Sequence, residues 1–206
     1  MKKIILPALV LSLGITACGG VDMEEADALN HDLLSAVDEL AEETEEAVEE
    51  PKDEDLYYSE DGRFKVKFAG VPKVNSDIVP TDVGNIEMMS FLYEKSVTEA
   101  YMVAYSDYPS ALVEQSSSKD MLIGARDGSS REMGIVSFDL DEEIEIDGNP
   151  GRYFKGKANS IHAEYKILLV GSRLYQIAIL RDGSYSMPER SDEFFNSFQL
   201  VKEEAE

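Results

Sequence analysis

Few side chains in this protein have a type and spacing that could do chemistry. The 206 residues include one cysteine, Cys18, and two histidines, His31 and His162. A hydrolase triad would need His162 to face both a serine nucleophile and an orienting acid. The sequence has no G-x-S-x-G motif to supply that serine. We therefore expect a protein that is not an enzyme and has no catalytic residue, with a hydrolase that uses His162 as an alternative.

A run of carboxylates, DLDEEIEIDG at residues 139–148, could bind calcium, which prefers oxygen ligands. An EF-hand loop needs glycine at its sixth position, which is Ile144 when counted from Asp139. Alternation of acidic and apolar residues gives a simpler interpretation, a strand with one solvated face. On that face we expect Asp139, Asp141, Glu143, Glu145 and Asp147. A calcium-binding domain is a second alternative, and we expect no metal ion or cofactor.

Nucleotide and nucleic-acid binding are disfavoured by charge and motif. The formal net charge is −23, whereas nucleic acid is bound by basic surfaces that displace counterions. The segments GSRLYQ and ARDGSSRE lack the glycine spacing of phosphate-binding loops. Tyrosines could line a ligand-binding face or pack at the rim of the core. The sequence does not identify a small-molecule ligand for such a face. The tyrosines in question are Tyr57, Tyr58, Tyr101, Tyr105, Tyr108 and Tyr185.

The position of Cys18 predicts that its thiol is covalently modified. Lys2 and Lys3 precede an almost wholly apolar run over residues 4–15, shorter than the roughly 20 residues that cross a bilayer. This order of charge, apolar run and small residues is typical of a secretory signal peptide. The alternative is a buried core helix with a buried cysteine. The segment ITAC, residues 15–18, resembles the lipobox of bacterial lipoproteins.

The lipobox resemblance implies that Cys18 receives a diacylglycerol on its sulfur. Residues 1–17 would then be a signal peptide removed before Cys18, and fatty acyl chains such as palmitate would anchor the new N-terminus. Two or more acyl chains hold a protein stably on a membrane, whereas one holds it marginally. The glycine directly after the cysteine, Gly19, resembles the residue type found at this position in lipoproteins that are sent to an outer membrane. The expected location is therefore the cell envelope, on the outer membrane facing the periplasm.

Residues 18–55 are predicted to form an acidic tether. Residues 19–55 contain 16 Asp and Glu against one lysine, Lys52. Apolar residues recur at helical spacing within it, at Ala26, Leu29, Leu33, Ala36 and Leu40. This pattern fits either a partner-binding helix or a solvated, partly helical or disordered spacer.

Residues 56–206 have the composition of one globular domain, which is long enough for a single core. Strands are predicted by alternating or continuous apolar residues at 63–70, 86–95, 100–106, 135–148 and 152–158. In the fourth of these, the apolar side is expected to carry Phe138, Leu140, Ile144 and Ile146. Residues 162–180 are predicted to form a hairpin, with Gly171-Ser172 as a type II′ turn.

Two helices are predicted between the strands. Ser117 to Asp120 resembles a capping box before MLIGARDG. Pro188 is expected to start the second helix, whose apolar stripe contains Phe194, Phe195 and Phe198. Because nothing alternates as βαβ, the predicted fold is α+β. It has a mainly antiparallel sheet of about six or seven strands covered by two helices, after a signal peptide and acidic tether.

The domain also resembles the PsbP-like α/β/α sandwich. The resemblance rests on DGRFKVKFAGVPK, AYMVAYSDYP, GNPGRYFKG with YKILLVGSRLYQIAIL, and FFNSFQL, within residues 58–201. It implies a non-catalytic binding or accessory module, and it implies no ligand or catalytic residue at any position of this chain. We therefore expect a lipid-anchored envelope protein. Its expected partners are the membrane, through Cys18, and another envelope protein, and we expect it not to bind nucleic acid.

Overall fold

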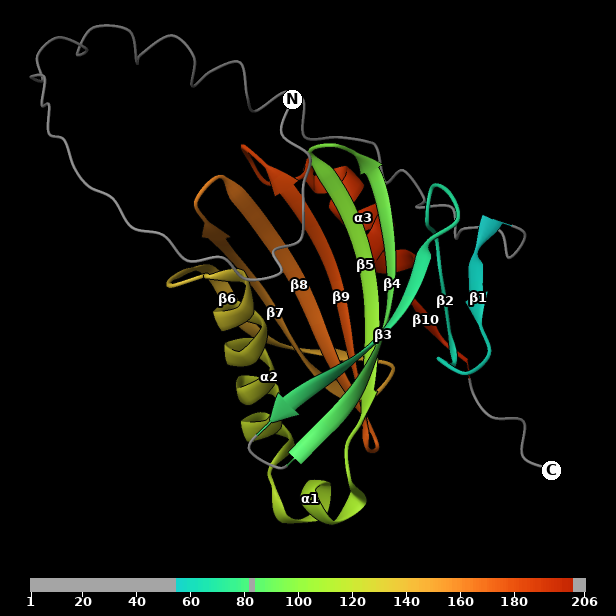
Figure 1. Cartoon of the computed structure of the whole chain (residues 1–206), viewed down its shortest axis with the longest axis vertical. Coiled ribbons are helices and arrows are strands. Elements are labelled where there is room, and N and C mark those ends of the chain that lie inside the picture. Colours follow the sequence, from blue (N-terminus) through green and yellow to red (C-terminus); the bar gives the residue numbers. More distant parts are fainter. Residues whose placement is uncertain (1–54, 82–83, 202–206) are drawn as a thin grey trace, which may run out of the picture. The chain divides into compact units, whose positions relative to one another are not determined.

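The computed structural model describes residues 55–81 and 84–201. The predicted signal peptide, Cys18 and nearly all of the acidic tether lie outside these residues. Figure 1 shows the described strands and helices. The strands are β1 (Tyr57–Ser59), β2 (Phe64–Val66), β3 (Lys73–Thr81), β4 (Gly84–Ser96), β5 (Glu99–Asp107), β6 (Phe138–Ile146), β7 (Asn149–Ala158), β8 (Ile161–Val170), β9 (Arg173–Asp182) and β10 (Gln199–Leu200). The helices are α1 (Ser110–Gln115), α2 (Ser118–Met133) and α3 (Pro188–Ser197).

Seven strands form one antiparallel sheet in the order β3-β4-β5-β9-β8-β7-β6. The other three form a small antiparallel sheet in the order β1-β2-β10. In Figure 1 the large sheet is a twisted layer, and α2 runs along the part of it that contains β7 and β8. The predicted α+β class and mainly antiparallel sheet are confirmed.

Both faces of the large sheet are apolar and covered, so the fold has three layers. On one face, Val103 of β5 belongs to a buried cluster with Phe194 of α3 and Phe64 of β2. On the other face, Ile167 of β8 belongs to a second buried cluster with Leu122 of α2. This two-sided burial explains why β8 and β9 are almost continuously apolar rather than alternating.

Local chemistry accounts for the helix ends as predicted. The Ser117 hydroxyl accepts a hydrogen bond from the backbone N–H of Asp120 at 3.0 Å and donates one to its carboxylate at 2.7 Å. The first of these bonds is the N-cap bond that the sequence predicts. The second joins the two side chains, whereas a full capping box would pair the Asp120 carboxylate with the backbone N–H of Ser117. Helix α2 ends at Gly134, whose φ of 76° is the left-handed cap that glycine favours. Pro188 is the first residue of α3, and Phe194 and Phe195 are buried.

Two of the tight hairpins also follow from their turn residues. Val170 pairs with Arg173 across Gly171-Ser172, and Gly171 has a φ of 59°. This geometry is that of the predicted type II′ turn. The turn between β6 and β7 is made by Asp147 and Gly148, whose φ values of 52° and 75° are those of a type I′ turn.

The prediction for the apolar side of β6 is wrong for Phe138. The pairing of β6 with β7 shifts register between Phe138 and Leu140, and such a bulge turns the residues on either side of it to opposite faces. Phe138 therefore lies on the α2 side, where its ring packs against Phe154 with centroids 5.7 Å apart. Ile146 lies on the other side and packs against the cluster that contains α3.

Four elements are additional to the prediction: the short strands β1 and β10, the longer strand β3 and the short helix α1. β3 is the edge strand of the large sheet and pairs with β4 over its whole length. Its side chains from Lys73 to Ile78 are exposed, so no core selects an apolar alternation there. α1 has six residues and none of them is buried, which leaves no amphipathic stripe to find in the sequence.

Two glycines should respond in opposite ways to alanine. A Cβ atom on Gly151 of β7 would lie 2.7 Å from the carbonyl oxygen of Ile167, so Gly151→Ala should lower the free energy of unfolding by about 1–3 kcal/mol. Gly124 lies inside α2 with no atom within 4 Å of the added Cβ, so Gly124→Ala should raise it by about 0.5–1 kcal/mol. Urea unfolding followed by circular dichroism measures both, and effects of the same sign would contradict the close approach of β7 and β8.

Candidate functional site

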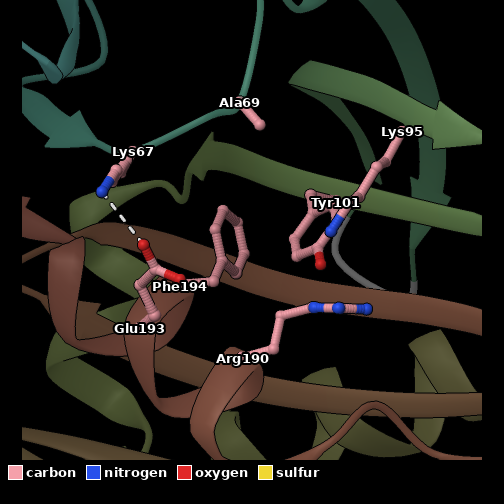
Figure 2. A pocket seen from close by; sticks show the side chains of 7 residues that line it. All are labelled: Lys67, Ala69, Lys95, Tyr101, Arg190, Glu193 and Phe194. Atoms are coloured by element: carbon pink, nitrogen blue, oxygen red, sulfur yellow. Dashed lines mark hydrogen bonds and ion pairs between the residues drawn. The ribbon is translucent and has the colours of Figure 1, made fainter.

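A small pocket lies where α3 meets β4, β5 and the segment that follows β2 (Figure 2). Its volume is about 100 Å³. It is lined by Lys67, Ala69, Lys95, Tyr101, Arg190, Glu193 and Phe194. Three of these seven residues are cations, which is unusual in a chain whose formal net charge is −23.

The cations are positioned by specific features of the fold. Lys95 lies at a register shift in the β4–β5 pairing, between Glu94 and Ser96. Because a bulge redirects a side chain that would otherwise alternate regularly, it explains how Lys95 comes to line the pocket. Arg190 is in the first turn of α3, two residues after Pro188 starts the helix. In the view of Figure 2 the ends of the Lys95 and Arg190 side chains lie near the hydroxyl end of Tyr101.

Each cation has a different partner. Lys67 forms an ion pair with Glu193 at 3.0 Å on the rim. Arg190 approaches Glu99 through Nη1 alone, at 3.4 and 3.5 Å from the two carboxylate oxygens. The Lys95 ammonium lies 5.8 Å from the centre of the Tyr101 ring, a cation–π distance.

Glu99 and Tyr101 form a buried pair below the cations. Glu99 is 6% exposed, and the Tyr101 hydroxyl donates a hydrogen bond to its carboxylate at 2.6 Å. Burial alone would raise the pKa of Glu99, but the bond from Tyr101 and the charges of Lys95 and Arg190 outweigh burial and lower that pKa. Burial and the same hydrogen bond raise the pKa of Tyr101. Glu99 is therefore charged at neutral pH and holds Tyr101 and Arg190 in place.

The arrangement contains groups that could bind an anion. The residues that line it supply positive charge and aromatic surface, and none of them is a histidine, cysteine or serine. Its volume is well below the roughly 300–1,000 Å³ of sites for drug-sized ligands. A small oxyanion, such as a carboxylate or phosphate group, has the charge and size that this pocket could accommodate.

The structure does not bring His162 together with a nucleophile and an acid. The Nδ1 atom of His162 lies 3.2 Å from the carbonyl oxygen of Ser160, and its ring packs edge-on against Tyr185 with centroids 4.8 Å apart. Within residues 55–81 and 84–201, its ring makes no hydrogen bond to a hydroxyl or carboxylate. The described part of the chain therefore does not assemble the triad that the hydrolase alternative requires.

The carboxylates of β6 do not share one solvated face as predicted. Asp141 faces α2 and pairs with Arg126 of that helix and with Arg152 of β7, at 2.5 Å from the latter. Burial alone would raise the pKa of Asp141, but the two arginines outweigh it and lower that pKa. Glu143 pairs with Lys119, and Asp139 accepts a hydrogen bond from Tyr185. No three metal-ligating side chains gather among the residues that the structure describes.

The six tyrosines do not form one binding face. Tyr101 and Tyr105 are buried in the cluster on the α3 side, while Tyr108 packs with the cluster on the α2 side. Tyr58 is exposed on β1. Tyr185 lies beside His162, so the six tyrosines are divided among four regions, and of these six only Tyr101 lines the pocket.

A second polar cluster surrounds Glu164 of β8, which is 1% exposed. Its carboxylate forms an ion pair with Lys155 at 2.9 Å and accepts hydrogen bonds from the hydroxyls of Ser191 and Tyr153. It also accepts one from the backbone N–H of Ser186 at 3.2 Å. Because Ser186 and Ser191 flank the first turn of α3, the cluster joins that helix to the large sheet, and the positive end of the helix dipole favours the charge.

The variant Glu164→Gln should therefore destabilise the fold. Glutamine keeps the shape but removes the charge that Lys155 and the helix terminus require, so we expect a loss of about 2 kcal/mol in the free energy of unfolding. The exposed residue Glu142 on β6 provides the control, since Glu142→Gln should stay within about 0.5 kcal/mol of the wild type. Adding Lys155→Met to Glu164→Gln should cost less than the sum of the single losses. Additive losses would contradict a direct pair.

The sequence did not predict the pocket. Lys67 and Glu193 are 126 positions apart, and none of the lining residues belongs to a spaced motif. A lysine and an arginine in an acidic chain have no local signal that separates them from other surface cations.

Comparison with known proteins identifies no family. No protein-family model and no curated protein sequence matches the chain. Among solved structures, a crystal structure from Bacteroides thetaiotaomicron VPI-5482 is similar at 10% sequence identity and a TM-score of 0.43. The match covers 72% of this chain and 49% of that one, so this chain spans about half the length of that structure. No described helix is both long enough and apolar enough to span a membrane.

Proposed function

We propose that this chain is a lipid-anchored protein of the cell envelope whose folded domain is a non-catalytic binding or accessory module. The observation that carries the proposal is the single cysteine, Cys18, at the end of ITAC behind a short cationic and apolar segment. Attachment of lipid to this single thiol would explain why it follows a short cationic segment, an apolar run and two small residues.

The proposal assigns three parts to the chain. Residues 1–17 are a signal peptide, residues 18–55 a lipidated acidic tether, and residues 56–206 the binding domain with a PsbP-like fold. Gly19 supports an outer-membrane anchor that faces the periplasm. As a flexible coil, the 37 residues after Cys18 would reach roughly 35 Å on average, and like charges would extend them. The tether would therefore hold the domain away from the lipid surface.

The pocket supports binding over catalysis. Its lining supplies three cations and two aromatic rings, Tyr101 and Phe194. Such groups recognise an anionic ligand or an acidic segment of a partner protein by charge and shape. The proposed partners are the membrane, through Cys18, and an envelope protein.

Mass spectrometry of the protein extracted from membranes tests the anchor. The expected N-terminal residue is Cys18, with a mass increased by a diacylglycerol and fatty acyl chains. An unmodified polypeptide that still begins at Met1 would overturn the proposal. Crosslinking in intact envelopes tests the accessory role, because a stoichiometric protein partner is expected and repeated recovery of lipid alone would contradict it.

A further inference from the structure

The pocket contains hydrogen-bond donors that the fold does not use. Among the residues that the structure describes, the Lys95 ammonium makes no hydrogen bond and no ion pair. The guanidinium of Arg190 uses only Nη1, at the long distances of 3.4 and 3.5 Å to Glu99. Its Nε and Nη2 atoms make no hydrogen bond to any described residue. Two neighbouring cations thus retain donors that can bind an oxyanion.

We propose that Lys95 and Arg190 form an oxyanion clamp, which binds a carboxylate or phosphate group of a ligand beside Tyr101. Arginine presents a planar fork of donors that matches the two oxygens of such a group, and lysine adds a point charge. Tyr101 and Phe194 provide apolar surface for the carbon atoms next to the charged group. The inference rests on the proposed binding function and names the ligand chemistry for it.

The other charges of the pocket leave the clamp positive. The Glu193 carboxylate is paired with Lys67 at 3.0 Å. Glu99 lies below the clamp, where its charge is shared between the Tyr101 hydroxyl and Arg190. Among the described residues, charges that lie more than about 8 Å from the pocket are largely screened at physiological ionic strength. An anion at the clamp therefore experiences the nearest cations most strongly.

The oxyanion could come from a separate molecule or from this chain. Residues 42–54 contain eight Asp and Glu and directly precede the described domain. The Glu193 carboxylate raises the pKa of Lys67, and the charge of Asp55 adds to this effect. Asp55, where the acidic segment joins the domain, is thus within electrostatic range of the pocket rim. A tethered segment acts at an effective concentration of about millimolar, so its carboxylates would compete with a free anion.

The test is a titration of the full-length chain, with or without lipid, in a neutral detergent with inorganic phosphate at constant ionic strength. The side-chain Nε–Hε signal of Arg190 in nitrogen-15 NMR spectra reports binding, and its absence from the spectrum of Arg190→Gln assigns it. A saturable shift is expected. Lys95→Gln should raise the dissociation constant roughly tenfold, as loss of a charge-assisted contact does.

A matched control is Lys157→Gln, which removes an exposed lysine of β7 that pairs with Asp139 at 3.8 Å. It should leave the dissociation constant within about twofold of the wild type. A Lys95→Gln variant that binds phosphate as tightly as this control would overturn the clamp.

A fourth variant identifies the source of the oxyanion. It replaces the glutamates at residues 42, 43, 45, 46, 49 and 50 by glutamine. If the chain's own segment occupies the clamp, this variant should bind phosphate roughly tenfold more tightly than the wild type. Equal binding by both indicates a separate anion. The absence of saturation in both overturns the inference. Because this titration does not depend on lipid, its failure is separate from failure of the Cys18 anchor.

Discussion

Replacing Cys18 by serine should abolish lipid attachment completely. Attachment requires a sulfur nucleophile, and a serine hydroxyl is not deprotonated at neutral pH in the way that a thiol partly is. The variant should therefore lack the mass of diacylglycerol and either keep residues 1–17 or leave the membrane fraction. Mass spectrometry and fractionation of the envelope measure both results, and the expected effect is complete rather than graded.

Gly19→Asp is the matched control for this variant. It leaves the thiol intact, so the protein should remain lipidated and membrane-bound. If the sorting that Gly19 suggests operates in the host, the variant should also move from the outer to the inner membrane. A Cys18→Ser protein that is processed and retained like the wild type would end the lipoprotein interpretation, whatever the position of Gly19→Asp.

Phe64→Ala should be among the most destabilising single substitutions in the domain. The ring of Phe64 is fully buried on β2, and it packs against Phe91 of β4 and Phe198 at centroid distances of 5.1 and 5.8 Å. It thus joins the small sheet to the large sheet and to the residue that follows α3. Truncation of a buried phenylalanine leaves a cavity and costs about 3–5 kcal/mol in the free energy of unfolding.

Tyr58→Ala on the neighbouring strand β1 is the control for Phe64→Ala. Tyr58 is 51% exposed, so its removal should cost less than about 1 kcal/mol. Urea unfolding followed by circular dichroism gives both values, and the slope with denaturant should stay the same if folding remains two-state. Equal losses for Phe64→Ala and Tyr58→Ala would contradict the packing of the small sheet onto the large one.

Local patterns in the sequence predicted those elements whose conformation depends on neighbouring residues. Ser117 and Asp120 form the predicted cap, Pro188 starts the predicted helix, and Gly171 forms the predicted turn. In each case the physical cause lies within a few residues, in a hydrogen bond, a fixed φ or a tolerated positive φ. Such causes are present in the sequence before any tertiary contact forms.

Elements without a local cause were missed or misplaced. β3 has exposed side chains on both faces and is a strand because β4 pairs with it. The bulge in β6 turned Phe138 to the opposite face, since a shift of one residue reverses the alternation. The partners of Asp141 followed from that shift, because they lie on α2 and β7.

The candidate site shows the same division between local and tertiary causes. The sequence by itself predicts lipid attachment at Cys18 and an acidic tether, because both predictions rest on residues that are adjacent in the chain. Only the tertiary structure brought Lys95 and Arg190 together beside Tyr101, through a bulge in β4 and the docking of α3. The interaction energy of charges from distant segments depends on the distances between them, and those distances are set only when the chain folds.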